Sequence, residues 1–347
     1  MRLDLHRHLE GSHSAAALRA VAREHGLGHA LLQDEAALRR ALVLTEPSDD
    51  ASKFYACIQV ARLAYVRPEV VGALAYRAFT EAASECDGFE MRVSLFSMTR
   101  AVLENQRVEW RARPPTDFAE HARGLLLQVL SARDRAQAET GIPMLVRLGF
   151  SRAFEAEPHQ RAVAGVVAEH ARALSGLDVL GIVKGEDTEP LPQALLSILR
   201  GLRSVLPDLT VHAGEFAGHG SVDRTLQLEP QAIGHGVRSV ESPDTLEQLA
   251  RRGVTLEVCP CSNHLLIPTS LAALRSLHGG HHPLPVLQRA GVRAVLGSDD
   301  PAPMGTDFRS EWSRAEALGA DMARLQADAV RRWAQLQPPA TSPRPTA

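Results

Sequence analysis

The sequence predicts an α/β fold, a (β/α)8 TIM barrel that carries extra helices inserted after its first strand. Short apolar runs alternate with longer amphipathic stretches along the chain, which is the pattern of a parallel sheet. Eight such units occur within 347 residues, a length that fits one large barrel. The segment 14–83 is too long for a single strand–helix unit, so we expect several additional helices there.

Eight apolar runs bounded by turn residues define the predicted strands, which are residues 3–6, 89–94, 143–148, 179–183, 209–212, 232–234, 255–258 and 294–296. Amphipathic stretches rich in alanine, leucine and arginine, such as 125–140, separate these runs and predict helices. The stretch 106–117 is rich in arginine and proline and is predicted to be a surface loop. We expect a single domain over 1–337 and a disordered tail, rich in proline, serine and threonine, over 338–347.

Composition excludes several classes of protein. The chain has 38 basic and 41 acidic residues, a net charge of -3, which argues against a basic nucleic-acid binder and against an acidic disordered chain. Aromatic residues make up only 4% of the chain, which disfavours a stacking surface for single-stranded nucleic acid. No apolar run approaches the ~18 residues of a membrane helix, and the N-terminus lacks the apolar core of a signal peptide. We therefore expect a cytoplasmic protein with no nucleic-acid or membrane partner, of undefined oligomeric state.

Polar side chains stand where predicted strands end, and four of them are metal-ligand types. His6 and His8 close the first strand, and side chains two residues apart on a strand point the same way. A His-x-His pair alone more often reflects two unrelated histidines. Here, however, His212 closes the fifth strand and Asp299 follows the eighth. Enzymes on this fold place their functional groups at that end of the strands, so we expect these four to meet.

Three neutral imidazoles and one carboxylate suit Zn²⁺, so the sequence predicts one zinc ion per chain. Such a ligand set also accepts iron, manganese or cobalt. An ion with an open coordination position would hold a water molecule and lower the pKa of that water from 15.7 toward ~7. The predicted chemistry is therefore metal-assisted hydrolysis.

Three further residues supply candidate acid–base chemistry at the same end of the barrel. His235 follows the sixth strand and is a candidate base for the proton of the attacking water. Glu215, three residues after His212, is placed to protonate a nitrogen in the ring of a substrate, next to the carbon that the water attacks. Asp300 can form a hydrogen bond with another edge of the ring. Glu257 lies inside the seventh strand, and we expect it to pair with a buried polar partner.

These motifs resemble those of the adenosine deaminase branch of the metal-dependent amidohydrolases. The matching segments are DLHRHLEGS at 4–12, VHAGE at 211–215, IGHG at 233–236, LEVCPCSN at 256–263 and GSDDP at 297–301, with a looser match of GFEMRVS at 88–94. Their order and spacing agree with the family from the first strand to the eighth, so the resemblance covers nearly the whole chain. It implies a (β/α)8 barrel with one catalytic zinc and hydrolytic deamination at C6 of an adenine ring, with release of ammonia.

The resemblance also implies a role for each matched residue. The positions of the family's zinc ligands are occupied here by His6, His8, His212 and Asp299. Glu215 matches the residue that hydrogen-bonds N1 and shuttles a proton, and His235 matches the residue that orients the water. Asp300 matches the residue that hydrogen-bonds N7. These roles agree with those inferred above from residue type.

Two departures from the family pattern concern the substrate. Glu10 stands where adenosine-specific members usually have the aspartate that contacts the ribose 5′-hydroxyl. Glutamate is common there in relatives that act on free adenine or on other adenine derivatives. The glycine of IGHG, in contrast, is typical of nucleoside deaminases. After the fourth strand, GIVKGED at 181–187 replaces the family's DLAGDE, and Gly185 is the residue expected to offer its backbone amide to N3. Lys184 is either a solvated surface lysine or a cation for a phosphate or carboxylate of a larger substrate.

The sequence therefore predicts zinc-dependent deamination of a small purine, adenosine or 2′-deoxyadenosine, to inosine or deoxyinosine and ammonia. Alternative substrates are a larger adenine nucleoside such as aminodeoxyfutalosine, or free adenine. A catalytically inactive barrel that acts as a binding module is the remaining alternative, and the complete set of ligands, acid and base argues against it. Deaminases that act on nucleic acids use a His/Cys/Cys zinc site, which this chain lacks.

Overall fold

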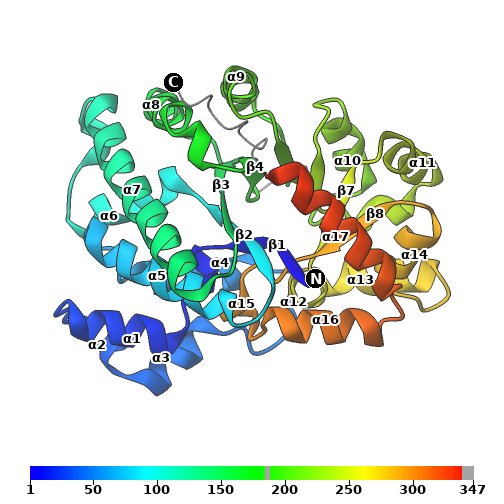
Figure 1. Ribbon diagram of the computed structural model, residues 1–347, viewed down its shortest axis with the longest axis horizontal. Coiled ribbons are helices and arrows are strands. Elements are labelled where there is room, and N and C mark those ends of the chain that lie inside the picture. Colours follow the sequence, from blue (N-terminus) through cyan, green and yellow to red (C-terminus); the bar gives the residue numbers. More distant parts are fainter. Residues whose placement is uncertain (184–187, 338–347) are drawn as a thin grey trace, which may run out of the picture.

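The computed structural model describes residues 1–183 and 188–337, and these form a (β/α)8 barrel, as predicted (Figure 1). Eight parallel strands follow one another in sequence order: β1 (Leu3–His8), β2 (Gly88–Val93), β3 (Met144–Ser151), β4 (Gly176–Leu180), β5 (Leu209–Ala213), β6 (Ala232–His235), β7 (Thr255–Val258) and β8 (Arg293–Leu296). A bridge between Arg7 and Asp299 closes the barrel. Its hydrogen bonds run from His8 N to Asp299 O at 2.7 Å and from Asp299 N to His6 O at 2.8 Å.

The strands are buried on both faces, because helices cover the outside of the barrel and side chains fill its interior. The junction of the first and last strands illustrates the outer packing. Leu3, Leu5 and Val295 pack against Trp333 and Leu336 of α17 (Met322–Leu336), which lies across this junction in Figure 1. Residues of the apolar runs from which the strands were predicted therefore face the helical layer.

Five helices lie between β1 and β2, as the length of this segment predicted: α1 (Ala15–Glu24), α2 (Ala30–Gln33), α3 (Glu35–Leu42), α4 (Ala51–Arg62) and α5 (Pro68–Ala83). The side chains of Ser14, Asp34 and Asp50 accept hydrogen bonds from backbone amides at the first turns of α1, α3 and α4. Such capping fixes where each helix begins. The first three helices pack to one side of the barrel (Figure 1), whereas α4 reaches the carboxyl ends of the strands.

The other helices complete the outer layer: α6 (Leu95–Asn105), α7 (Pro115–Thr140), α8 (Glu157–Glu169), α9 (Gln193–Leu202), α10 (His219–Leu226), α11 (Pro243–Arg252), α12 (Pro260–Leu266), α13 (Pro268–Leu277), α14 (Pro283–Arg289), α15 (Pro301–Met304) and α16 (Phe308–Ala317). Proline occupies the first or second position of α5, α7, α8 and α11 to α15. Its fixed φ suits a helix start, where its missing N–H leaves no hydrogen bond broken.

Two local predictions were wrong. The fourth strand is Gly176–Leu180 and not 179–183, because the charged Asp178 lies inside the strand and finds partners in Arg92 of β2 and His212 of the adjacent β5. The stretch 106–117 is not simply a surface loop, since Trp110 is buried against Phe96 and Phe118. The helix α7 already begins within this stretch.

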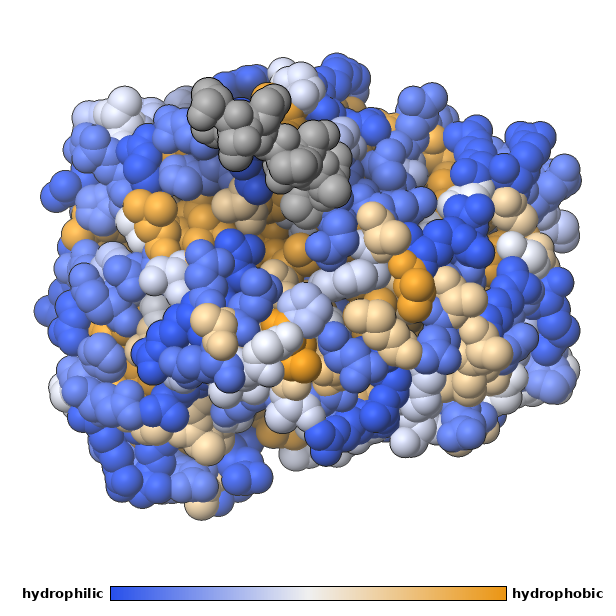
Figure 2. All heavy atoms as spheres, viewed as in Figure 1, coloured by the Kyte–Doolittle hydropathy of each residue, from blue (hydrophilic) through white to orange (hydrophobic). Residues whose placement is uncertain are grey.

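Within the described residues, no helix combines the length and the apolar character needed to cross a membrane. The face of the molecule drawn in Figure 2 is mainly hydrophilic, with apolar side chains in small, separate groups. The predicted tail 338–347 and the residues Lys184 and Gly185 lie outside the described residues.

Candidate active site

Four potential metal ligands converge at the carboxyl end of the barrel strands. His6 and His8 come from β1, His212 from β5 and Asp299 from the turn after β8, and one ligand atom from each lies within 4.8 Å of the others. The Nε2 atoms of His6 and His8 are 3.2 Å apart, and each lies 3.3–3.5 Å from Asp299 Oδ1. All four residues are buried. The structure therefore brings together the complete set that the sequence analysis proposed.

The chemistry of this donor set fits a divalent metal ion. Burial lowers the pKa of His8 well below its ordinary value and also lowers the pKa of His212, so both imidazoles are neutral near pH 7. Neutral imidazoles and an ionised carboxylate are the forms that bind metals. Two ring nitrogens as close as those of His6 and His8 cannot both carry a proton toward the same point, whereas a cation placed there would satisfy both. Zn²⁺ is suited to three nitrogens and one oxygen.

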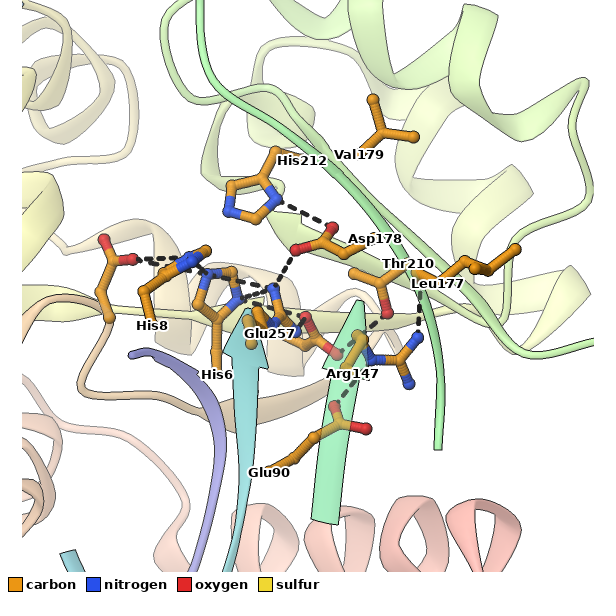
Figure 3. Close-up of polar contacts among 12 residues, drawn as sticks. His6, His8, Glu90, Arg147, Leu177, Asp178, Val179, Thr210, His212 and Glu257 are labelled. Atoms are coloured by element: carbon orange, nitrogen blue, oxygen red, sulfur yellow. Dashed lines mark hydrogen bonds and ion pairs between the residues drawn. The ribbon is translucent and has the colours of Figure 1, made fainter. Parts of the chain in front are cut away.

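Carboxylates behind the imidazoles fix their orientation. Glu257 Oε2 lies 3.1 Å from His6 Nδ1, and Asp178 Oδ1 lies 3.1 Å from His212 Nδ1 (Figure 3). A histidine that donates Nδ1–H to a carboxylate presents an unprotonated Nε2 on its other side, as a metal ligand requires. The expectation that Glu257 pairs with a buried polar group is confirmed.

Arg92 of β2 joins these two carboxylates inside the barrel. Its guanidinium lies 3.3 Å from Asp178 Oδ2 and also contacts Glu257 Oε2, and all three side chains are inaccessible to solvent. Although burial raises the pKa of Glu257, Arg92 holds that pKa below its usual range. Sequence reasoning missed Arg92 and Asp178. The feature of the sequence that could have revealed them is the presence of charged residues within two short apolar strands, GFEMRV and GLDVL.

Two site residues have a backbone conformation that non-glycine residues rarely adopt. His235, at the end of β6, and Asp299, after β8, both have φ of 60°. Conformations of this kind are unfavourable by about 1–3 kcal/mol each and persist where the surrounding structure imposes them. For Asp299, the imposing contacts are the two backbone hydrogen bonds that close the barrel. Both side chains line the same cavity.

Glu215 and His235 face each other across the same cavity. His235 Nε2 lies 3.4 Å from Glu215 Oε2 and 3.9 Å from Asp299 Oδ2, and Asn263 Nδ2 lies 3.2 Å from His235 Nδ1. Burial raises the pKa of Glu215 well above its ordinary value, and the negative charge of Asp299 adds to the increase. Burial also lowers the pKa of His235. In this arrangement the protonated carboxyl of Glu215 can donate a proton as an acid, and the neutral imidazole of His235 can accept one as a base.

The turn that carries Glu215 is held by a second buried carboxylate. Glu189 accepts hydrogen bonds from the backbone amides of Gly214, Glu215 and Phe216 at 2.8, 3.0 and 2.8 Å. It also contacts the hydroxyl of Ser221. Glu189 follows the segment after β4 in which this sequence departs from the family pattern. Nothing in the sequence around Glu189 indicated that its carboxylate would hold this turn.

A cavity of about 90 Å³ is lined by His8, His212, Glu215, His235 and Asp299. Asp300 lies on its wall, where burial and the neighbouring Asp299 raise the pKa of the Asp300 carboxyl. Glu10 is also on the wall, 3.7 Å from Arg62 of α4, and its Oε1 has no hydrogen-bond partner. Gly181, directly after β4, lines the cavity with φ of +82°. Gly185, the residue expected there, lies outside the described residues.

The fold and the site together define a (β/α)8-barrel protein with a candidate metal centre and an acid–base pair at the carboxyl ends of its strands. Comparison with known proteins gives the family. The sequence profile of the family described as adenosine deaminase matches residues 2–335. The chain therefore belongs to the adenosine deaminase family.

Curated relatives carry three different substrate names. An adenine deaminase of Chelativorans sp. is 42% identical over 121 residues, 34% of this chain and 35% of that protein. An aminodeoxyfutalosine deaminase of Streptomyces avermitilis is 32% identical over 241 residues, 66% of this chain and 63% of the relative. The chain thus spans less than two thirds of the length of these two relatives. An adenosine deaminase of Serratia proteamaculans is 29% identical over 312 residues, 89% of this chain and 85% of that protein.

Solved structures agree with the fold. The adenine deaminase of Arthrobacter aurescens superimposes with a TM-score of 0.75 at 20% identity and covers 96% of both chains. An amidohydrolase from Burkholderia ambifaria, solved with bound Zn, gives a TM-score of 0.71 at 17% identity, over 95% of this chain and 84% of that chain. At these identities the likeness concerns the fold alone.

Proposed function

We propose that this protein is a metal-dependent hydrolase that deaminates an adenine compound and releases ammonia. The observation that carries the proposal is the convergence of His6, His8, His212 and Asp299 on one point, with Glu215 and His235 facing the same cavity. Membership in the adenosine deaminase family and the names of the curated relatives support the same reaction. We infer one Zn²⁺ per chain from the three-nitrogen, one-oxygen donor set.

The residues of the cavity divide the chemistry among them. Bound zinc would supply an acidic, activated water. His235, held neutral by burial, accepts a proton from the attacking water. Glu215, held protonated by burial, donates its proton to a ring nitrogen and so makes the adjacent carbon more electrophilic. Asp300, whose pKa is also raised by burial, donates a hydrogen bond to a nitrogen on the other edge of the ring. The bond between the ring carbon and the amino group then breaks. The amino group takes the proton held by His235 and leaves as ammonia, and the added hydroxyl becomes a carbonyl and returns a proton to Glu215.

Adenosine or 2′-deoxyadenosine is the substrate that we propose first, since the most extensively aligned of the three relatives is named an adenosine deaminase. Free adenine and aminodeoxyfutalosine are the competing substrates, in keeping with the other two relatives. We propose that a backbone amide of the segment after β4 binds N3. Gly181 of this segment lines the cavity, and Gly185, the residue expected from the sequence, lies outside the described residues. The proposed partner is therefore a small purine.

The decisive experiment is a deamination assay on zinc-loaded protein. It follows the ultraviolet change from adenine to hypoxanthine chromophore with adenosine, deoxyadenosine, adenine, AMP and aminodeoxyfutalosine. Turnover of at least one compound supports the reaction, and the preferred compound defines the substrate. Absence of turnover on all five by protein with stoichiometric zinc would overturn the proposed reaction. Failure to bind zinc at all would favour the inactive binding module.

Substitution of a proposed ligand is expected to lower metal content. His6→Ala and Asp299→Ala each remove one of four donors, so zinc occupancy after dialysis should fall well below one ion per chain. Metal analysis measures this directly. His264→Ala removes an exposed histidine on α12 and should leave occupancy unchanged. Full occupancy in both ligand variants would remove His6 and Asp299 from the ligand set.

Substitution of Glu10 is expected to change the preference between nucleoside and free base. Glu10→Asp shortens a buried carboxylate on the cavity wall and makes room there for a sugar. We expect the ratio of kcat/KM for adenosine to kcat/KM for adenine to rise. Glu247→Asp, the same change at an exposed position of α11, is the control. An unchanged ratio in Glu10→Asp would show that residue 10 does not contact the sugar.

A further inference from the structure

A carboxylate and a guanidinium face each other on the wall of the active-site cavity without a direct hydrogen bond. Glu10 lies in the short 3-10 turn that follows β1, and Arg62 lies in the last turn of α4. Both side chains line the cavity, and Arg62 Nη2 lies 3.7 Å from Glu10 Oε1. This separation exceeds the hydrogen-bond range of about 2.7–3.2 Å. The two charges attract each other without satisfying each other's hydrogen-bonding capacity.

Each member of this pair keeps a buried polar atom without a partner. Glu10 is only 4% exposed, and its Oε1 accepts no hydrogen bond from the described residues. The Nε of Arg62 is likewise buried and donates to no acceptor in the described part of the chain. A buried charged group without hydrogen bonds is unfavourable, because it has lost water and gained nothing in return. The pair therefore has the character of a binding site that a ligand completes.

The surrounding contacts hold both members of the pair in position. Asn105 of α6 donates hydrogen bonds from Nδ2 to the carbonyl oxygens of Arg62 and Tyr65, both at 2.9 Å. The hydroxyl of Tyr65 lies 2.7 Å from Nε2 of His13, three residues after Glu10, and both side chains are buried. The end of α4 and the turn after β1 are thus tied together. A site whose groups are already in position loses less conformational entropy when it binds a ligand.

The opposite charges of the pair select the kind of group that can bind to both. An anion such as a phosphate would be attracted by Arg62 and repelled by Glu10, and the reverse holds for a cation. A hydroxyl group can donate to Glu10 Oε1 and accept from Arg62 at the same time. A hydroxyl oxygen about 2.8 Å from both atoms fits their separation of 3.7 Å, since the two hydrogen bonds then diverge by about 80°. The pair therefore favours an uncharged hydroxyl.

The position of the pair relative to Asp300 indicates which part of a substrate carries this hydroxyl. Gly11, the neighbour of Glu10, packs against Asp300 so closely that a β-carbon at Gly11 would lie 1.9 Å from Asp300 Oδ1. In the reaction proposed above, Glu215 contacts the six-membered ring of adenine and Asp300 contacts the opposite edge. That edge belongs to the five-membered ring, which carries the sugar of a nucleoside. The pair is therefore next to the side of the base from which a sugar extends.

We propose that Arg62 is a specificity-determining residue, which together with Glu10 binds one hydroxyl group on the sugar of an adenine nucleoside. This inference rests on the proposed function and narrows it. Free adenine has no hydroxyl to offer to the pair, and a nucleotide brings an anion close to Glu10. The preferred substrate is therefore an uncharged nucleoside, and Arg62 contributes to that preference by donating a hydrogen bond to the sugar.

The test removes the hydroxyl groups of the substrate one at a time. Adenosine is compared with 2′-deoxyadenosine, 3′-deoxyadenosine, 5′-deoxyadenosine, adenine and AMP. We expect kcat/KM to fall by about 10–100-fold for one of the three deoxy compounds, the loss typical of a hydrogen bond to a charged group. Adenine and AMP should also fall below adenosine. Equal values for adenosine and all three deoxy compounds, or a preference for adenine or AMP, would overturn the proposal and leave the deaminase reaction intact.

Substitution of Arg62 makes the test specific to this residue. Arg62→Met removes the donors, so kcat/KM for adenosine should fall by about 10–100-fold, whereas the sensitive deoxy compound should change little. Arg62→Lys keeps a charged donor and should recover part of the loss. Arg23→Met, the same change at an exposed position of α1, is the matched control and should behave as the unsubstituted protein. Equal losses for both compounds in Arg62→Met would show that Arg62 only neutralises Glu10 and would contradict the proposal.

Calorimetric binding separates this proposal from the proposed function. If zinc-loaded protein deaminates none of these compounds, the proposed reaction fails, but the affinities still report on the pair. Tighter binding of adenosine than of one deoxy compound, with the difference lost in Arg62→Met and retained in Arg23→Met, would support the contact with the hydroxyl. Equal affinities for adenosine and all three deoxy compounds in the unsubstituted protein would reject it.

Discussion

Replacement of Glu215 by glutamine is expected to lower kcat by about 10²–10⁴-fold without loss of zinc. The amide keeps the size and the hydrogen-bonding capacity of the side chain but cannot transfer a proton. Glu215 is buried, and burial raises its pKa, which favours the protonated carboxyl. Because the proposed transfer occurs during the reaction, the substitution should affect kcat far more than KM. Steady-state kinetics together with metal analysis measure both effects.

The control for this experiment is Glu316→Gln, the same change at an exposed position of α16. It should retain full activity and full zinc content. A Glu215→Gln variant that turns over near the unsubstituted rate would remove Glu215 from the acid role. Loss of zinc in Glu215→Gln, on the other hand, would indicate a structural contribution to the metal centre.

Replacement of Arg92 by methionine is expected to destabilise the apo protein by about 3–5 kcal/mol, because it leaves Asp178 and Glu257 as buried, uncompensated charges. The same carboxylates orient His212 and His6, so zinc affinity should also fall, by about 10–100-fold. Urea denaturation of metal-free protein measures the first effect, and competition with a chelator measures the second. Arg92→Lys, which keeps the charge but loses the planar guanidinium, should show a smaller loss of stability.

A second buried arginine provides the control for the effect on zinc. Arg147 of β3 pairs with Glu90 at 2.9 Å and with Asp208 at 2.7 Å, and Asp208 directly precedes β5, so this cluster lies toward the amino ends of the strands. Arg147→Met should destabilise the protein by a comparable amount and leave the zinc affinity of the folded protein unchanged. Equal losses of zinc affinity in the Arg92 and Arg147 variants would show that Arg92 has no specific role in orienting the ligands.

The position of the candidate site could be predicted from sequence because local signals coincide there. His212, His235 and Asp299 each stand where a short apolar run stops and a turn begins, and the ends of parallel strands meet at one edge of a barrel. The extra helices between β1 and β2 were also predictable, since the segment is too long for a single strand–helix unit. These inferences require only the local period of hydrophobicity and the topology.

The partners of the buried charges could not be predicted in the same way. Arg92, Asp178 and Glu257 come from three separate strands, and Arg92 lies 86 residues from Asp178 and 165 residues from Glu257 in the sequence. In the sequence alone, Asp178 interrupts an apolar run. The fourth strand is therefore predicted after it, at 179–183. Similarly, the side of α4 that lines the active-site cavity follows from how the helix packs on the barrel, which its own sequence does not specify.

The left-handed conformation of His235 and Asp299 bears on how this protein responds to selection. Glycine adopts such a backbone without steric penalty, so the scaffold gains backbone relief when either residue is replaced by glycine. Relief of the backbone alone would therefore favour glycine at these two positions and would erase the proposed centre. The buried contacts of both side chains and the demand for turnover act against that change. In a lineage released from that demand, positions 235 and 299 are where decay of the site should begin.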